Sequence, residues 1–216
     1  MVKILGVSGS PRKAATEYAL KQALEAAEEV PGVTTEFISL GGKKINFCIH
    51  CDRCIKEGAI SCVIHKDDMS NLYQPFYDAD GYIFASPVYD MGITGQLATY
   101  FNRFRPVYTL LKQNPRYFSS KVGGAIAVGG TRNGGQECTL NNILGFYYTN
   151  GILAVSGGMG VYHGACVWSQ DRKAQGAEED LLGIKNVRFI GKRVAETAVM
   201  VKAGVMALQS ETNRAG

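Results

Sequence analysis

The sequence lacks any apolar run long enough to cross a membrane, which argues against a membrane-spanning helix. The N-terminal apolar run, residues 1–6, is too short for a signal peptide and favours a strand. Net charge is only +4 in 216 residues, and there is neither a basic helix nor an aromatic platform for nucleic acid. Internal repeats are absent as well. We therefore expect a cytoplasmic protein with one domain, residues 1–216, and neither nucleic acid nor a membrane as partner.

Cysteine is the residue type whose spacing carries most information. Four of the six cysteines lie in one short segment: Cys48, Cys51, Cys54 and Cys62. Three are spaced by two residues and the fourth follows after seven, so four thiolates could hold a [4Fe–4S] cluster. The bacterial ferredoxin run differs, because its last cysteine follows three residues and precedes proline. The pattern thus predicts one self-contained cluster.

Other interpretations of the cysteine segment remain open. Structural zinc also takes four cysteines, but usually as two separated pairs. A thioredoxin-like pair would leave the third cysteine without a role, and disulfides need an oxidising compartment. His50 and His65 flank the run as possible replacement ligands, and Cys138 and Cys166 lie far from it. Basic residues also surround it, either as a docking surface for an acidic electron donor or as a solvated face: Lys43, Lys44, Arg53, Lys56 and Lys66.

A second candidate site begins where the first apolar strand, residues 2–7, gives way to a helix from about residue 15. Backbone N–H groups of such a loop and of the helix N-terminus can bind a phosphate. The glycines do not fit a dinucleotide fingerprint, and no Walker lysine follows. One phosphate, as in FMN, therefore fits better than a pyrophosphate, although an ordinary capped turn would look similar. The candidate residues are Ser8, Ser10, Pro11, Arg12, Lys13, Ala15 and Thr16.

Two later strands also end in loops suited to a ligand. Residues 81–85 and 122–129 are apolar strand candidates, and open α/β sheets bind ligands beyond the carboxyl ends of their strands. Glycines in the second loop would let the backbone approach a flat ring. The candidates after residue 85 are Pro87, Val88, Tyr89, Met91 and Gly92, and those after residue 129 are Thr131, Arg132, Gly134, Gly135 and Gln136.

The remaining pattern predicts a doubly wound α/β fold. Strands near 34–40 and 151–156 bring the total to five, and helices alternate with them near 67–77, 95–112 (kinked at Pro106) and up to 149. Residues 157–176 look like a long loop, residues 184–208 like the last helix, and 210–216 like a frayed tail. Short right-handed connections favour a five-stranded parallel sheet of order 2-1-3-4-5, flavodoxin-like, with the cysteine segment 45–66 inserted after the second strand.

Together these motifs resemble the iron–sulfur flavoproteins of the NADPH-dependent FMN reductase superfamily. The compact cysteine motif, the Ser8–Thr16 loop, the Ser86–Tyr89 loop and the Arg132–Glu137 loop carry the resemblance. It implies FMN, a [4Fe–4S] cluster, a ferredoxin-like donor and a homodimer or a tetramer made of two dimers. It also implies that FMN lies near a subunit interface, close to a neighbour's cluster.

Three functions are consistent with these observations. The first is a flavin-dependent oxidoreductase that passes electrons from the donor through the cluster to FMN, and on to dioxygen, peroxide or a quinone-like acceptor. No acid–base residue is required, and Tyr89 and His163 are the candidates if a proton is needed. The second is an NAD(P)H-dependent FMN or quinone reductase. The third is a zinc-stabilised FMN-binding redox sensor.

Overall fold

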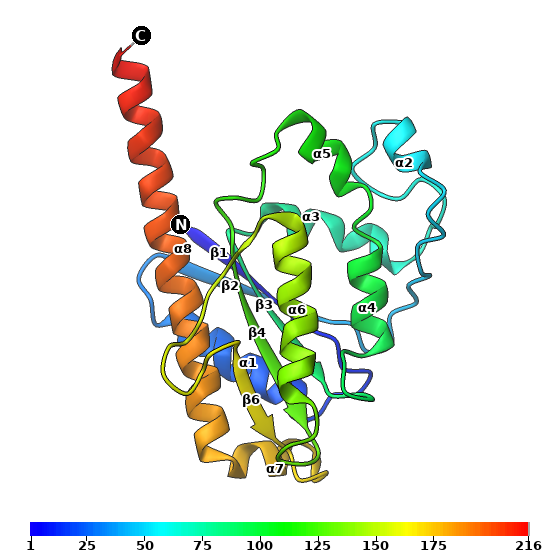
Figure 1. The fold of residues 1–216 in the computed structure, drawn as a ribbon, viewed down its shortest axis with the longest axis vertical. Coiled ribbons are helices and arrows are strands. Elements are labelled where there is room, and N and C mark those ends of the chain that lie inside the picture. The colour runs from blue at the N-terminus through cyan, green and yellow to red at the C-terminus, as the bar shows by residue number, and fades with distance from the viewer. Residues whose placement is uncertain (216) are drawn as a thin grey trace.

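A central sheet runs through the protein with helices on both faces (Figure 1), in a computed structural model that describes the backbone of residues 1–215 and the side chains of residues 1–211. The strands are β1 (Val2–Ser8), β2 (Val33–Ser39), β3 (Gly81–Pro87), β4 (Val122–Gly129), β5 (Leu153–Ala154) and β6 (Ala165–Trp168). All are parallel, in the order β2-β1-β3-β4-β5, with β6 also paired to β4. The predicted flavodoxin-like strand order is confirmed.

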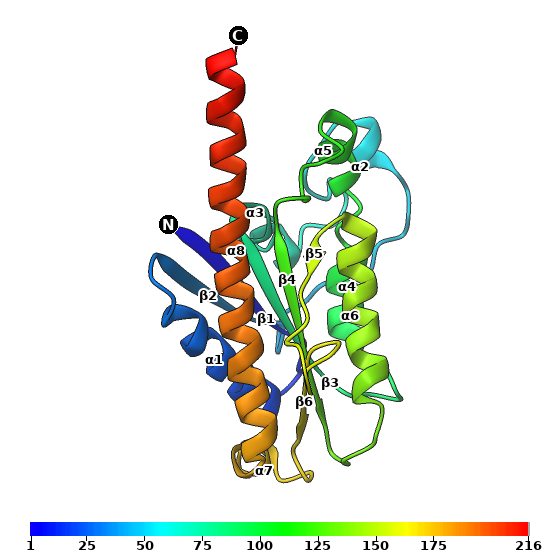
Figure 2. The same cartoon turned by 60° about the vertical axis from the view of Figure 1, so that its left-hand side comes forward.

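Alternating side chains of the buried strands divide the core into two clusters. Ile83 and Ala85 of β3 pack against α1 (Ala15–Glu28), α7 (Lys173–Glu179) and α8 (Leu181–Ala215). Tyr82 and Phe84 face the opposite way and pack among α3 (Tyr73–Asp78), α4 (Gly95–Asn102) and α6 (Gln136–Asn150). Successive residues of a strand point to opposite faces, so each cluster receives every second side chain. Figure 2 shows α1 and α8 on one side of the sheet, α4 and α6 on the other, and α8 reaching beyond the strands.

Several predicted elements are wrong in their bounds. The predicted helix 95–112 is two helices, α4 and α5 (Val107–Gln113). α4 ends at Asn102, and Pro106 stands directly before α5, because a proline lacks the N–H that a continuous helix would need at this position. The predicted helix 67–77 is a 3-10 turn, η1 (Asp68–Asn71), followed by α3. The last helix begins at Leu181 and continues through Ala215, so residues 210–215 are helical rather than frayed, and residue 216 lies outside the described chain.

The fifth strand position is also more complex than predicted. Only Leu153 and Ala154 pair with the start of β4; the chain then leaves the sheet and returns as β6 beside the end of β4. Gly158, Gly160 and Gly164 have positive φ in this excursion, a conformation that glycine adopts readily and that interrupts a strand. Residues 157–176 therefore contain β6 and the start of α7, not one long loop.

The cysteine segment lies between β2 and η1 and contains little regular structure. Its single helix, α2 (Arg53–Lys56), has one turn and lies near α5 (Figure 1). In Figure 1 this segment is at the opposite end of the molecule from α7 and the carboxyl end of β4. Among the described helices, none combines the length and the apolar character that crossing a membrane requires.

Candidate functional site

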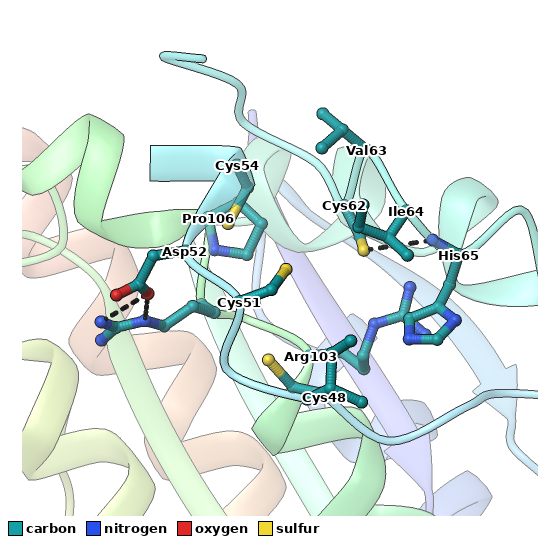
Figure 3. Close-up of a pocket in the computed structure, with 12 residues that line it drawn as sticks. Cys48, Cys51, Asp52, Cys54, Cys62, Val63, Ile64, His65, Arg103 and Pro106 are labelled. Carbon is teal, nitrogen blue, oxygen red and sulfur yellow. Dashed lines mark hydrogen bonds and ion pairs between the residues drawn. The ribbon is translucent and has the colours of Figure 1, made fainter. Parts of the chain in front are cut away.

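All four cysteines of the motif line one hollow, which we call the cysteine hollow (Figure 3). His50 and Asp52 have left-handed backbone conformations, with φ of 54° and 56°. These turns reverse the chain between successive cysteines, so the four sulfurs face a shared space in Figure 3. The lining residues are Cys48, Ile49, Cys51, Asp52, Cys54, Cys62, Val63, Ile64, His65, Arg103, Arg105 and Pro106.

Polar contacts tie this irregular segment to the helices around it. The backbone N–H of Cys48 donates to Asn102 Oδ1 at 2.7 Å, at the C-terminal end of α4. Arg105 makes an ion pair with Asp52 at 2.8 Å, and the Tyr77 hydroxyl donates to the Ile60 carbonyl at 2.7 Å. Because these partners belong to α3, α4 and the turn before α5, the folded helices fix the positions of the cysteines.

Arg103, which lines the cysteine hollow, forms a buried ion pair with Asp67. Their side chains are 1% and 6% exposed, and Arg103 Nη1 lies 2.7 Å from Asp67 Oδ2. Burial by itself would raise the pKa of Asp67, but hydrogen bonds from Arg103 and from Asn46 outweigh it and lower that pKa to about 2. Breaking a buried pair costs several kcal/mol because one charge is left without a partner, so this pair holds its surroundings firmly.

The cysteine hollow has the donor set that an iron–sulfur cluster requires. Among the described residues, no three His, Cys, Asp or Glu side chains are arranged to hold a single metal ion. A cubane cluster makes a different demand, since each thiolate binds a different iron and the sulfurs stand further apart. All four thiols are free. Two of the lining residues carry buried nitrogens without a hydrogen-bond partner, namely Arg103 Nε, Arg103 Nη2 and His65 Nε2.

Cys54 is the most buried thiol of the motif. Burial raises the pKa of its thiol, and the charges of Cys62, Cys48 and Cys51 raise it further, against a lowering by the Ile55 backbone. Metal binding requires thiolates and releases their protons. An iron centre would therefore relieve both the burial cost and the mutual repulsion. The residues fit the cluster, and their role as ligands remains a prediction.

A second hollow, the phosphate-loop hollow, lies at the carboxyl ends of β1, β3 and β4. Its volume of about 230 Å³ exceeds that of one water molecule several-fold. Seven of the predicted residues line it: Ser10, Arg12, Ala15, Thr16, Pro87, Val88 and Tyr89. Six further residues line it that were not among the predicted ligands: Ala14, Val128, Gly130, Ser169, Asp171 and Lys173.

The start of α1 is suited to a phosphate. Ala14 precedes the helix and makes no side-chain cap, so the N–H groups of the first turn are available to an anion. The hydroxyl of Ser10 donates to the Arg12 carbonyl at 2.7 Å and accepts from the Arg12 N–H at 3.1 Å. Ser8 is fully buried, and its hydroxyl accepts from the Ser10 N–H at 3.4 Å. Both serines therefore shape the loop around the site.

The two predicted ring-side loops pack against each other. Asp90 and Met91 have φ of 47° and 67°, and Tyr89 and Gly92 exchange backbone hydrogen bonds across them, as in a tight reverse turn. A Cβ added to Gly135, whose φ is +100°, would lie 2.7 Å from Met91 Sδ. Glycine at this position therefore permits the contact between the loops.

A further hollow beside these loops, the loop hollow, is lined by Met91, Arg132, Asn133, Gly135, Gln136, Glu137, Cys138, Gly160, Tyr162 and Cys166. The Arg132 guanidinium lies over the Trp168 ring at 4.2 Å. The Gln136 side chain donates to the Thr131 carbonyl at 2.6 Å and accepts from the Gly134 N–H at 2.9 Å, so it shapes its own loop. Six predicted residues line neither of these two hollows: Ser8, Pro11, Lys13, Gly92, Thr131 and Gly134.

Three of these six residues, Ser169, Asp171 and Lys173, come from one place in the chain, directly after β6. Ser169 is buried and donates from its N–H to the Gly129 carbonyl at 2.8 Å. Asp171 lies so close to Gly130 that a side chain there would collide with the carboxylate. The signal in the sequence is a polar run, residues 169–173, directly after a short apolar one. It is recognisable only if residues 165–168 are assigned to a strand.

The cysteine hollow and the phosphate-loop hollow share no lining residue. Helix α4 lies between them. Thr94 caps its first turn and donates to the Gly9 carbonyl at 2.6 Å, whereas Asn102 at its last turn holds Cys48. The helix has 8 residues, which corresponds to a length of about 12 Å. Within one chain, the cysteine hollow and the phosphate-loop hollow are therefore separated by the length of α4.

Comparisons with known proteins agree with this arrangement. The profile of the family described as NADPH-dependent FMN reductase matches residues 2–164. The chain is 45% identical over 190 residues to an iron–sulfur flavoprotein of Methanocaldococcus jannaschii, covering 87% of this chain and 92% of the relative. It is also 45% identical over 194 residues to an iron–sulfur flavoprotein of Archaeoglobus fulgidus, covering 89% and 95%.

Solved structures show the same fold at lower identity. A flavone reductase superposes with a TM-score of 0.68 at 23% identity, covering 93% of this chain and 64% of the other. A flavodoxin, WrbA-like protein from Agrobacterium tumefaciens gives 0.61 at 20% identity, covering 93% and 99%. These structures show the fold, while the family profile and the sequence relatives show that the chain is a flavin-dependent oxidoreductase and that it belongs to the iron–sulfur flavoproteins of the NADPH-dependent FMN reductase family.

Proposed function

We propose that the protein takes single electrons from a ferredoxin-like donor through a [4Fe–4S] cluster held by Cys48, Cys51, Cys54 and Cys62, and passes them by way of FMN to an acceptor such as dioxygen, peroxide or a quinone-like compound. The observation that carries the proposal is the convergence of four free thiols on one hollow, whose lining residues Arg103 and His65 carry buried nitrogens without a partner. FMN, when bound, supplies the ability to accept electrons one at a time and to store two.

The chain's own residues bind and orient the cofactors in this proposal. The uncapped first turn of α1 binds the phosphate, with Arg12 at the rim of the hollow. Val88 and Tyr89 line the same hollow, and Gly135 fixes the spacing between their loop and the next. The buried Asp67–Arg103 pair holds the start of the cysteine segment through Asn46.

Charge around the cysteine hollow suits an acidic electron carrier. Lys43, Lys44, Lys56 and Lys66 are exposed, as is Arg53, which pairs with Glu57 at 2.7 Å. Cationic groups near a site raise the rate of encounter with an anionic partner, and salt screens the effect. A ferredoxin-like donor is therefore the partner that we propose. A cytoplasmic location belongs to the same proposal, because thiols stay reduced there.

The visible spectrum of anaerobically purified protein, before and after addition of reduced ferredoxin, tests the proposal. We expect flavin bands on a broad iron–sulfur shoulder, with both bleached by ferredoxin. The matched control is Cys51→Ala, which should lose the shoulder and retain FMN, because the phosphate loop shares no residue with the cysteine hollow. A wild-type protein with flavin but no iron, and no response to ferredoxin, would contradict the proposal and favour a zinc-stabilised sensor.

The second candidate function is that of an NAD(P)H-dependent FMN or quinone reductase. The loop hollow favours this function. Its volume is about 570 Å³, it lies beside the proposed ring-side loops and it is lined by Met91 and Tyr162. It therefore has room for the nicotinamide or quinone ring of a second substrate. Bleaching of the flavin by NADPH in Cys51→Ala, at the same rate as in the wild type, would support this function over the first.

A further inference from the structure

Arg103 is a buried cation with hydrogen-bonding capacity that the folded chain does not use. Its side chain is 1% exposed. One nitrogen, Nη1, donates to the Asn46 carbonyl and to Asp67 Oδ2, each at 2.7 Å. The other two, Nε and Nη2, are buried and have no partner.

Such donors are costly to leave unsatisfied. A buried polar group without a partner typically destabilises a protein by ~1–3 kcal/mol, and more when the group is charged. Native structures therefore pair nearly all such groups, and an exception indicates an absent ion, water or ligand. Arg103 lines the cysteine hollow together with Cys48 and Cys62 (Figure 3). The missing acceptor therefore belongs to whatever occupies that hollow.

Arg105 lines the same hollow and shows the contrasting case. Its Nε donates to Asp52 Oδ1 at 2.9 Å, and its Nη2 lies 2.8 Å from the same carboxylate oxygen. The guanidinium also lies over the Tyr108 ring at 4.6 Å, and the side chain is 23% exposed. The Arg105 guanidinium thus has a carboxylate partner and is partly open to solvent, whereas two donors of the Arg103 guanidinium are buried without a partner.

We propose that Arg103 is a positioning residue for the iron–sulfur centre, donating hydrogen bonds from Nε and Nη2 to its sulfur atoms and raising its reduction potential. This inference rests on the cluster assigned under the proposed function. Hydrogen bonds to the sulfurs and local charge are two of the properties that set a cluster's potential. Reduction adds negative charge, so a fixed cation and two donors stabilise the reduced form more than the oxidised form. Asp67 and Asn46 hold the guanidinium in the orientation that this requires.

Redox titration of the reconstituted protein, followed by electron paramagnetic resonance, tests the inference. Arg103→Lys retains a positive charge that can pair with Asp67 but loses the planar fork of donors. We expect it to keep its iron and to have a more negative midpoint potential than the wild type. Asp67→Asn removes a negative charge from the same pair, and we expect its potential to move in the positive direction. Arg105→Lys, the matched control, should move it least.

Opposite shifts in the two variants separate an electronic role from a structural one. If Arg103 only supported the fold, both substitutions would loosen the same ion pair and move the potential in the same direction. That result, or an unchanged potential in Arg103→Lys, would overturn the inference and leave the cluster assignment intact. Absence of iron from the wild-type protein would instead overturn the proposed function.

A measurement on protein that retains Arg103 covers the case in which Arg103→Lys does not fold. Arginine labelled with ¹⁵N is incorporated into Arg105→Lys protein, so that Arg103 is the labelled guanidinium at the hollow. Pulsed electron paramagnetic resonance of the reduced cluster should then detect coupled ¹⁵N that is absent from unlabelled protein. Lack of ¹⁵N coupling in protein that contains the cluster would overturn the inference.

Discussion

At the scale of single residues, Asp67 organises more of the cysteine segment than any cysteine does. Its Oδ2 accepts from the Asn46 N–H at 2.9 Å and from the Asn46 amide at 3.0 Å, besides the 2.7 Å contact with Arg103. Its Oδ1 accepts from the Met69 N–H at 3.2 Å. One carboxylate thus joins the chain before the cysteines, the turn after α4 and the start of η1. Cys54 is the one buried side chain in residues 45–66, so the segment has no apolar core of its own and depends on such polar contacts for its position.

Acid should therefore weaken the fold through Asp67. Its pKa in the folded protein is about 2, below the ordinary value of 3.8, so its stabilising effect is complete above pH 4 and is lost as the pH falls towards 2. A difference of nearly two pKa units corresponds to roughly 2.5 kcal/mol. At pH 5 the wild type should have a larger free energy of unfolding than Asp67→Asn. We expect this difference to become smaller by about this amount when the pH is lowered from 5 to 2. Urea unfolding of the iron-free proteins measures it, and a constant difference would contradict the prediction.

The sequence predicted the residues of the cysteine hollow unevenly. Regular spacing made Cys48, Cys51 and Cys54 recognisable, because ligands close in sequence form a pattern. Arg103 and Asp67 are 36 residues apart and look like ordinary surface charges in the sequence. Only the packing of α4 against the segment brings them together and buries them, so no local pattern could have identified them.

At the scale of helices and strands, the same distinction explains which loops were predicted. The loops after β1, β3 and β4 were identified because each follows an apolar strand of at least 7 residues. The loop after β6 was missed because that strand has 4 residues and pairs only with β4. Assigning β6 as a strand depends on its pairing with β4, which lies about 40 residues earlier in the chain, rather than on the periodicity of its own residues. Lys173, which follows it, was missed for the same reason.

The packing of α1 against α8 depends on one glycine and gives a second prediction. A Cβ on Gly191 would collide with the backbone carbonyl of Ala23, so the helices would have to separate. We expect Gly191→Ala to lower the free energy of unfolding by ~1–3 kcal/mol. Gly204, later in the same helix, has no atom within 4 Å of its added Cβ. Gly204→Ala should instead raise the free energy by ~0.5–1 kcal/mol, through helix propensity and a less flexible unfolded chain.

Chemical denaturation of the two alanine variants beside the wild type checks this pair of predictions. Because the substitution and the helix are the same, any general effect of alanine cancels between them. Equal stability changes in the two variants would show that α1 and α8 do not approach as closely as the structure has them.

At the scale of the whole molecule, the separation of the two hollows is the feature with functional consequence. The cysteine hollow is lined by residues of α2 and of the turn before α5, whereas the phosphate-loop hollow is lined by residues at the carboxyl ends of the strands. Figure 1 shows α4 between these two groups of elements. A dimer, alone or paired into a tetramer, could bring the cysteine hollow of one subunit to the phosphate-loop hollow of another. Cyclic dimers are the commonest oligomers, and their symmetry would create two such junctions at once. We therefore propose a homo-oligomer in which electrons cross between subunits.

Subunit complementation tests this proposal directly. Cys51→Ala should leave a chain with FMN but no cluster, and Arg12→Glu, which reverses the charge at the rim of the phosphate-loop hollow, should leave a cluster but weaken FMN binding. Neither homo-oligomer should reduce its flavin with ferredoxin. If electrons cross the interface, co-expressed hybrids regain one working junction of two, and random pairing then predicts roughly a quarter of the wild-type rate. A hybrid of wild type with the doubly substituted chain has its intact cluster and flavin on the same subunit. If electrons cross the interface, this hybrid should be inactive, so that the mixture shows only the activity of its wild-type dimers. Activity in this hybrid, together with no activity in the hybrid of Cys51→Ala with Arg12→Glu, would instead place the transfer within one chain.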